Sequence, residues 1–154
     1  MSSDPYNLQR FLSAQKEAYE SALRELRAGH KHGHWMWFVF PQLDGLGSSS
    51  TARHYAIKNL DEAAAYLAHP VLGSRLIECC EALLFVRETK GLSARAILDT
   101  PDDLKLCSCA TLFSNLTTGH PVFARIISQY YYDCPDTRTL ELLRDQGRHT
   151  PGRL

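Results

Sequence analysis

The sequence has no hydrophobic run long enough to cross a membrane and no excess of charge of either sign. Its longest uncharged apolar stretch, around residue 35, is far shorter than the roughly 18 residues that a membrane helix needs. The residues after Met1 combine no basic segment with an apolar one, so we expect no secretory leader, no membrane association and a cytoplasmic location. Seventeen basic residues balance seventeen acidic ones. This neutral balance disfavours binding to bulk nucleic acid.

The five cysteines form no recognisable zinc-binding pattern. Cys79 and Cys80 are adjacent and Cys107 and Cys109 are two apart, and neither spacing is that of a zinc knuckle. We therefore expect reduced and mostly buried thiols. The alternating histidines at 30–34 have no carboxylate or cysteine at ligand spacing, which favours a solvated loop. The sequence predicts no metal site and no cofactor.

Apolar residues recur at helical spacing along most of the chain. Between residues 8 and 26 they predict a long first helix that begins at Asp4–Pro5, ends at Gly29 and carries Arg10 on its solvated face. No strand candidate has a convincing partner. The sequence therefore predicts a compact all-α single domain of about seven or eight short helices over residues 4–144, with a frayed tail at 145–154. The later helices are expected at 51–56, 59–67, 70–86, 93–98, 100–118, 120–131 and 135–143.

The stretch from His34 to Gln42 is the most unusual part of the chain. It contains both tryptophans and two of the six phenylalanines, and no charge falls between Lys31 and Asp44. Aromatic residues favour a strand, but polar residues do not alternate with them, and a lone strand leaves its backbone groups without partners. We expect a short buried helix or an extended segment that ends at Pro41.

The edges of this stretch carry the residues best suited to binding a ligand. The loop from Gly45 to Ser50, with Gly47 and Ser48 at its centre, runs into a predicted helix and would present backbone N–H groups to an anion. Arg53 on that helix and Lys105 would add positive charge. Lys105 precedes a mostly apolar helical segment, so we expect it to lie near the core and to need an anion, either a carboxylate or a ligand. Both tryptophans, Trp35 and Trp37, would stack on a flat ligand. Of the stretch itself, residues 37–40 best suit the core, and the edge with Trp35 best suits function. The alternatives are that the loop is an ordinary capped turn without a ligand and that the tryptophans only fill the core.

Three polar residues at the same edges are the candidates for chemistry. His34 borders the aromatic run and suits a general acid or base, and Gln42 and Asp44 would polarise a bond or a water molecule. Cys107 and Cys109 would need an adjacent base to act as nucleophiles, and the sequence shows none. The sequence leaves open whether the protein is an enzyme.

Several segments match a known family: 4–11, 34–42, 52–57, 69–73, 101–106 and 111–113. In these segments the chain resembles the bacterial family known as domain of unknown function 1810, some members of which are labelled calpastatin. The resemblance extends to about Leu143 and implies a small, mainly helical, single-domain protein. True calpastatin is an unstructured inhibitor, so that label does not fit a chain with a core. The family has no established activity that could be transferred.

Two functions are consistent with these features. The first is a pocket for a small anionic, nucleotide-like ligand, in one form with hydrolytic chemistry, and it predicts that Trp35, Arg53 and Lys105 converge. The alternative is a non-enzymatic protein-interaction module or homodimer in which the aromatic stretch is core or interface. The sequence leaves the oligomeric state open.

Overall fold

A computed structural model of the chain describes residues 3–148, and all regular secondary structure in that range is helical. The predicted all-α single domain is confirmed. No helix of this part of the chain is long and apolar enough to cross a membrane. The helices are α1 (Gln9–Ala28), α2 (Met36–Val39), α3 (Ser50–His54), α4 (Leu60–Ala68), α5 (Leu72–Lys90), α6 (Ala94–Leu98), α7 (Asp102–Ser114), α8 (Val122–Tyr131) and α9 (Thr137–Arg148).

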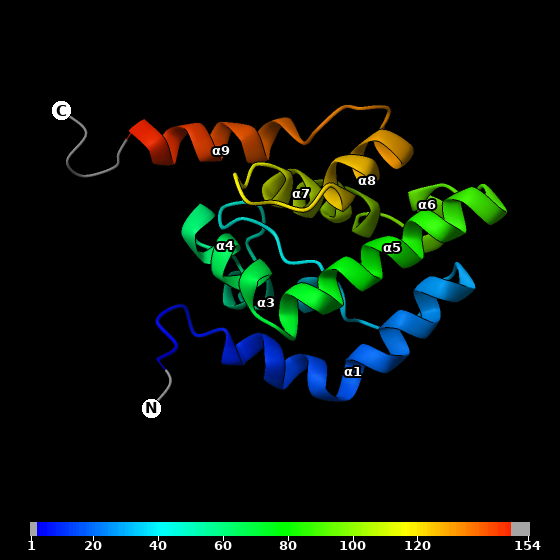
Figure 1. Cartoon of the computed structure of the whole chain (residues 1–154), viewed down its shortest axis with the longest axis horizontal. Coiled ribbons are helices and arrows are strands. Elements are labelled where there is room, and N and C mark those ends of the chain that lie inside the picture. Colours follow the sequence, from blue (N-terminus) through cyan, green and yellow to red (C-terminus); the bar gives the residue numbers. More distant parts are fainter. Residues whose placement is uncertain (1–2, 149–154) are drawn as a thin grey trace.

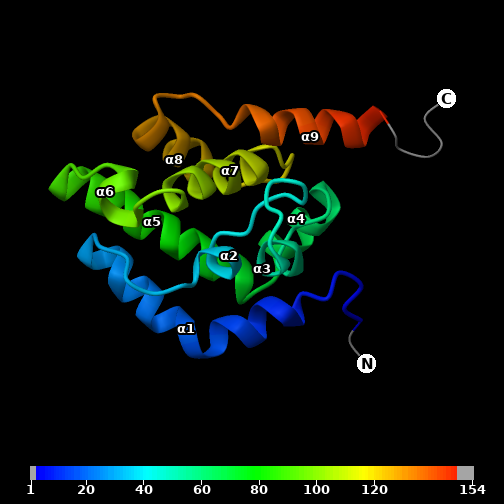
Figure 2. The same ribbon diagram turned by 180° about the vertical axis from the view of Figure 1, so that it is seen from behind.

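Helix α5 lies at the centre of the molecule, with α1 along one side and α7 and α8 along the other (Figure 1). Helix α9 packs on the outer side of α7. Seen from behind, the short α2 lies between α1 and α7 (Figure 2). Because α5 is covered on both sides, its apolar residues spread over most of its surface. Helix α1 instead buries one apolar face and exposes the opposite, polar face.

Aromatic rings join the layers of the core. Phe11 on α1 meets the edge of Tyr66 on α4, with ring centres 5.0 Å apart. Tyr66 lies 5.7 Å from Phe113 on α7, and Phe113 stacks on Phe123 of α8 at 5.3 Å. All four rings are fully buried. Such tilted and edge-to-face pairs contribute beyond the area that they bury, so this row of rings ties four helices together.

The first helix begins later than its sequence pattern predicts. Asn7 has a left-handed backbone, with φ at 51°, and α1 starts at Gln9 rather than at Asp4–Pro5. Asp4 still binds the helix start from the preceding turn, because its carboxylate accepts hydrogen bonds from the backbone N–H of Leu8 at 2.7 Å and of Gln9 at 3.0 Å. These bonds lower the pKa of Asp4.

Two further predictions need correction. The described part of the chain holds nine helices rather than seven or eight, because the aromatic stretch forms one of its own. Helix α9 continues through Arg148, so the predicted boundary at 144/145 falls inside a helix. The Gln146 side chain donates a hydrogen bond to the carbonyl of Lys58 at 2.7 Å, which attaches this end of α9 to the domain. The rest of the predicted tail, 149–154, lies outside the described residues.

Gly73 allows α5 to start directly against the end of α4, and this gives a test of the packing. A Cβ at Gly73 would lie 1.9 Å from the carbonyl oxygen of Leu67, which is backbone and cannot move aside easily. We predict that Gly73→Ala lowers the free energy of unfolding by about 3 kcal/mol in chemical denaturation. The control Ser74→Ala, at an exposed neighbour on α5, should change it by less than about 0.5 kcal/mol. Equal stability of both variants would contradict this packing.

Candidate functional site

Two hollows lie in the surface between α2 and α3, and Trp37 and Tyr55 line both of them. The first, which we name the narrow cleft, has room for about one water molecule, about 10 Å³. The second, which we name the outer hollow, has a volume of about 540 Å³. The narrow cleft is lined by Trp37, Gln42, Leu43, Gly47, Ala52, Tyr55 and Ala56. The outer hollow is lined by His34, Trp37, Phe38, Ser50, Thr51, His54 and Tyr55.

The single turn of α2 determines which aromatic side chains reach this surface. Met36 and Val39 are three positions apart on the helix, so they share one face, and both are buried. Trp37 and Phe38 therefore lie on the other side and are only half-buried. The helical turn is closed by backbone bonds from Val39 to Trp35 and from Phe40 to Met36.

The segment between Gln42 and Lys58 forms the other wall. Its two ends are joined by a parallel bridge, in which Ile57 donates to the carbonyl of Gln42 at 2.8 Å and Asp44 donates to the carbonyl of Ile57 at 2.7 Å. Between these ends, the Ser49 hydroxyl caps α3 by accepting from the N–H of Ala52 at 3.1 Å. The predicted anion-binding loop is therefore a capped turn that leads into a helix of five residues.

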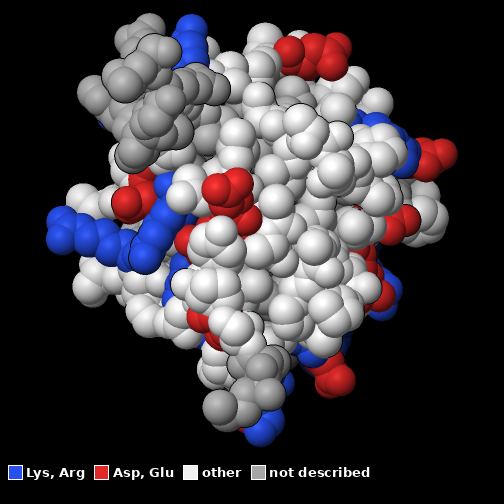
Figure 3. Space-filling model, turned by 60° about the vertical axis from the view of Figure 1, so that its left-hand side comes forward, with Lys and Arg blue, Asp and Glu red and all other residues white. Residues whose placement is uncertain are grey.

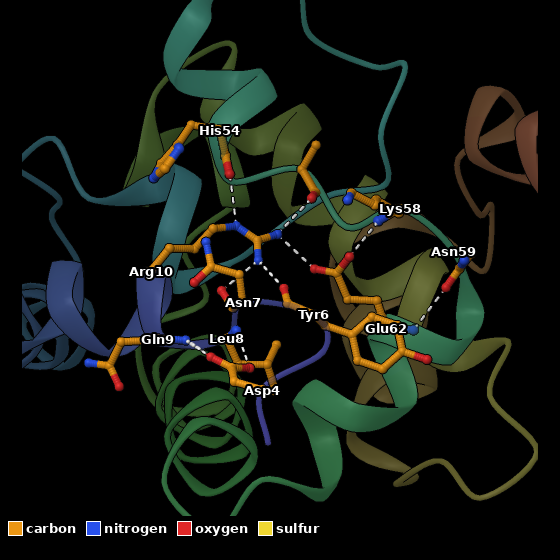
Figure 4. Close-up of polar contacts among 11 residues, drawn as sticks. Asp4, Tyr6, Asn7, Leu8, Gln9, Arg10, His54, Lys58, Asn59 and Glu62 are labelled. Atoms are coloured by element: carbon orange, nitrogen blue, oxygen red, sulfur yellow. Dashed lines mark hydrogen bonds and ion pairs between the residues drawn. The ribbon is translucent and has the colours of Figure 1, made fainter. Parts of the chain in front are cut away.

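A buried arginine fixes this segment to the rest of the domain (Figure 4). The Arg10 side chain is 8% exposed and its partner Glu62 is 0% exposed, with Nη2 and Oε2 2.7 Å apart. The sequence pattern places Arg10 on the solvated face of the first helix, which is wrong. All five N–H donors of this guanidinium are used: they donate to Glu62 and to the carbonyls of Tyr6, Asn7, His54 and Ala56, at 2.6–2.9 Å.

The second carboxylate oxygen of Glu62 also has a partner. It accepts a hydrogen bond from the backbone N–H of Lys58 at 3.1 Å. The backbone N–H of Glu62 is bound in turn by Asn59, the N-cap of α4, at 2.9 Å. We name the set formed by Arg10, Glu62 and the four carbonyls the Arg10 clasp. It joins the turn before α1, the end of α3 and the start of α4.

Lys105 on α7 lies beside an aromatic ring of α2 but lines neither hollow. Its Nζ is 4.8 Å from the centre of the Trp37 ring, a distance at which a cation interacts favourably with the ring face. The same Nζ lies 3.3 Å from Asp102, which also pairs with Lys31 at 2.9 Å. Asp102 thus supplies an anion for Lys105 from within the protein.

Trp35 does not face a ligand, contrary to prediction. It is only 2% exposed, and its ring N–H donates to the Glu25 carboxylate at 3.0 Å. The same carboxylate oxygen accepts from the backbone N–H groups of His32 at 2.7 Å and Gly33 at 2.8 Å. Partial burial raises the pKa of Glu25, but the bonds from Gly33, His32 and Trp35 outweigh it and leave this pKa below its ordinary value. Trp35 is therefore part of the core and fixes the loop that leads into α2.

The other predicted site residues divide into two groups. His34 lines the outer hollow, and Gln42 and Gly47 line the narrow cleft. Asp44, Ser48 and Arg53 are exposed and line neither of these two hollows. The three residues proposed for chemistry therefore do not converge on one point.

The prediction from sequence missed Tyr55 as a wall residue. Its ring lies 5.4 Å from that of Phe38 and 4.6 Å from that of His54, and it borders both hollows. The available signal is an aromatic residue near the end of the predicted helix 51–56. Its neighbour Thr51 was equally overlooked, because a hydroxyl in a short exposed helix has no distinguishing pattern.

Four of the five thiols are poorly suited to chemistry. Cys79, Cys80 and Cys109 are buried, and burial raises the pKa of Cys79 to about 12 and those of the other two well above their ordinary value. Burial, with the charge of Asp136 as a smaller cause, raises the pKa of Cys107 to about 11. No group of three or more metal-ligating side chains that could hold an ion occurs among residues 3–148.

Comparison with known proteins identifies the family. The family described as "Protein of unknown function (DUF1810)" matches residues 5–143. The chain belongs to the DUF1810 family. The DUF1810 chain is also similar to the crystal structure of the conserved hypothetical protein Rv1873 from Mycobacterium tuberculosis, with 50% identity, a TM-score of 0.87, and coverage of 92% of this chain and 99% of that one. No curated protein matches it. The resemblance seen in the sequence is confirmed.

The Arg10 clasp gives a prediction on stability. Arg10→Met leaves the buried Glu62 and four carbonyls without their donor, so we predict a loss of about 3–5 kcal/mol in the free energy of unfolding. The matched control is Arg138→Met, because Arg138 forms an exposed pair with Glu141, with side chains 58% and 53% exposed. Chemical denaturation should show a change of at most about 1 kcal/mol for the control. Comparable losses in the two variants would show that the clasp is not a structural centre.

Proposed function

We propose that the outer hollow of this DUF1810 protein binds a small, flat, negatively charged molecule of the nucleotide type. The observation that carries the proposal is the meeting of aromatic and polar side chains from α2 and α3 around one hollow. Its volume of about 540 Å³ is large enough for a small molecule, and the hollow is widely open to solvent.

The aromatic part of the wall suits a flat ring. Trp37, Phe38 and Tyr55 are each half-buried, so each keeps some ring surface open. Stacking of a base on such a side chain contributes about 1–3 kcal/mol. Lys105 interacts with the Trp37 ring from outside the hollow, and its charge is paired with Asp102.

The polar part of the wall suits an acidic group. Ser50 and Thr51 offer hydroxyl groups, and His34 and His54 offer ring N–H groups. No carboxylate is among the residues that line the outer hollow. Hydrogen-bond donors without a competing acid favour a phosphate or carboxylate over a cation. The proposal is one of binding, because His34, Gln42 and Asp44 lie apart.

The distribution of charge fits a local site rather than a broad electrostatic surface. On the face shown in Figure 3, acidic and basic side chains lie among one another and wide areas carry neither. That face therefore shows no continuous basic patch of the kind that binds a phosphate backbone. Recognition of an anion would depend on the donors within the outer hollow.

The two tryptophans allow a direct test. Trp35 is buried and Trp37 lies at the outer hollow, so a ligand that stacks there should change the fluorescence of Trp37. We predict that adenosine monophosphate or a related nucleotide quenches this emission. At about one hundred times its dissociation constant it should add about 2.7 kcal/mol to the free energy of unfolding.

Two variants make this test specific. Trp37→Ala should weaken binding about 5- to 150-fold, which corresponds to the stacking energy of one base. Tyr132→Ala, which removes an aromatic side chain that is 88% exposed elsewhere on the surface, should leave binding unchanged. No stabilisation by any of a panel of nucleotides and sugar phosphates would refute the proposal and favour an interaction module. Equal effects of the two variants would refute the placement of the site.

A further inference from the structure

A separate hollow lies between α1 and the start of α5. It has a volume of about 540 Å³ and is lined by Gln9, Leu12, Ser13, Lys16, Val71 and Arg75. It shares no lining residue with the outer hollow or the narrow cleft. Two of its residues are cations and none is an acid. We name it the Arg75 hollow.

The guanidinium of Arg75 is held from two sides. Its Nη1 donates to the side-chain oxygen of Gln15 at 3.2 Å, and its central carbon lies 4.6 Å from the centre of the Tyr19 ring. An arginine stacked on a ring and bound by an amide loses little further freedom when it binds an anion.

The orientation of Gln15 is itself fixed by buried partners. Gln15 is 1% exposed, and its amide nitrogen donates to the carbonyl of Phe38 at 2.7 Å and to the hydroxyl of Tyr66 at 3.1 Å. Because the nitrogen is committed to these two acceptors, the oxygen faces Arg75. A buried polar side chain thus positions an arginine at the edge of the hollow.

Within the described part of the chain, Arg75 is half-buried and forms no ion pair with an acid. The ion pairs among residues 3–148 involve other basic residues. The acid one turn further along α5, Glu78, accepts from the Tyr19 hydroxyl and lies 3.7 Å from Arg27. The guanidinium has five donors, and one of them is used by Gln15.

We infer that the Arg75 hollow binds a small oxyanion, a carboxylate or a phosphate, that carries a short aliphatic group. The planar guanidinium can bind two oxygens of such a group side by side, and Lys16 adds a second charge. The Ser13 hydroxyl accepts from Gln9 at 3.2 Å, which leaves its own hydrogen for a ligand oxygen. Leu12 and Val71, the latter 38% exposed, provide the apolar surface for the aliphatic part.

Calorimetric titration with four probes tests the inference. Pentanoate and pentyl phosphate represent the two oxyanion classes with an aliphatic group, inorganic phosphate lacks that group, and pentylamine carries the opposite charge. We expect pentanoate or pentyl phosphate to bind and pentylamine not to bind. Whichever of pentanoate and pentyl phosphate binds more tightly identifies the preferred acidic group. Tighter binding of pentyl phosphate than of inorganic phosphate shows that Leu12 and Val71 contact the aliphatic part. Failure of both pentyl oxyanions to bind, or equal binding of pentylamine, would overturn the inference.

Variants locate the binding and separate it from the function proposed above. Arg75→Gln should weaken binding at least tenfold and Lys16→Gln about threefold. Arg24→Gln, which changes an exposed arginine of α1, and Trp37→Ala should leave it unchanged. If circular dichroism shows that Arg75→Gln is unfolded, the variant Lys16→Gln, at an exposed position, tests the site instead. Loss of affinity in Lys16→Gln supports the site, and unchanged affinity overturns it. Equal affinity of folded Arg75→Gln and the wild type would also overturn it.

Discussion

The guanidinium of Arg10 is the contact on which the candidate site depends. Its partners come from three separate places: the turn before α1, the end of α3 and the first turn of α4. A buried charge is costly unless it is paired and its remaining hydrogen-bonding groups are satisfied. Here the five donors are all used, and both oxygens of Glu62 are bound. Displacement of residues 42–58 would break the bonds from Arg10 to the carbonyls of His54 and Ala56 and leave buried donors without acceptors. The Arg10 clasp therefore favours one position of this segment.

The opposite wall of the site is fixed by polar groups of α1 in a similar way. Helix α2 has four residues and is too short to be stable alone. Gln15 binds the carbonyl of Phe38, and Glu25 binds the ring of Trp35 and the loop before it. These bonds place Trp37 at the surface while its neighbours fill the core. Helix α1 therefore positions both walls of the outer hollow and, through Gln15, the guanidinium of Arg75.

The sequence predicts the helical fold well because amphipathic spacing is a local signal. It misplaces the start of α1 because the cap acts from the preceding turn, across the left-handed Asn7. It assigns Arg10 to solvent because periodicity identifies a helix face but not the carbonyls that a distant segment brings to that face. It assigns Trp37 to the core and Trp35 to the functional edge, and the structure reverses this: Trp35 is buried and Trp37 lines the outer hollow. One helical turn provides too little periodicity to show which aromatic side chain faces inward. The expectation that Lys105 would need an anion is met by Asp102.

The central claim is that the Arg10 clasp holds the wall formed by residues 42–58. Native-state hydrogen exchange on Arg10→Lys tests it most directly, because lysine keeps the charge and loses the five-donor fork. The amides of Asp44 and Ile57, which close the bridge at the ends of that segment, are the reporters, and amides within α5 are the reference. We predict that the protection factors of the two reporter amides fall at least tenfold, while those of the α5 amides fall much less. Unchanged protection, or an equal loss at the reporters and throughout α5, would contradict the account.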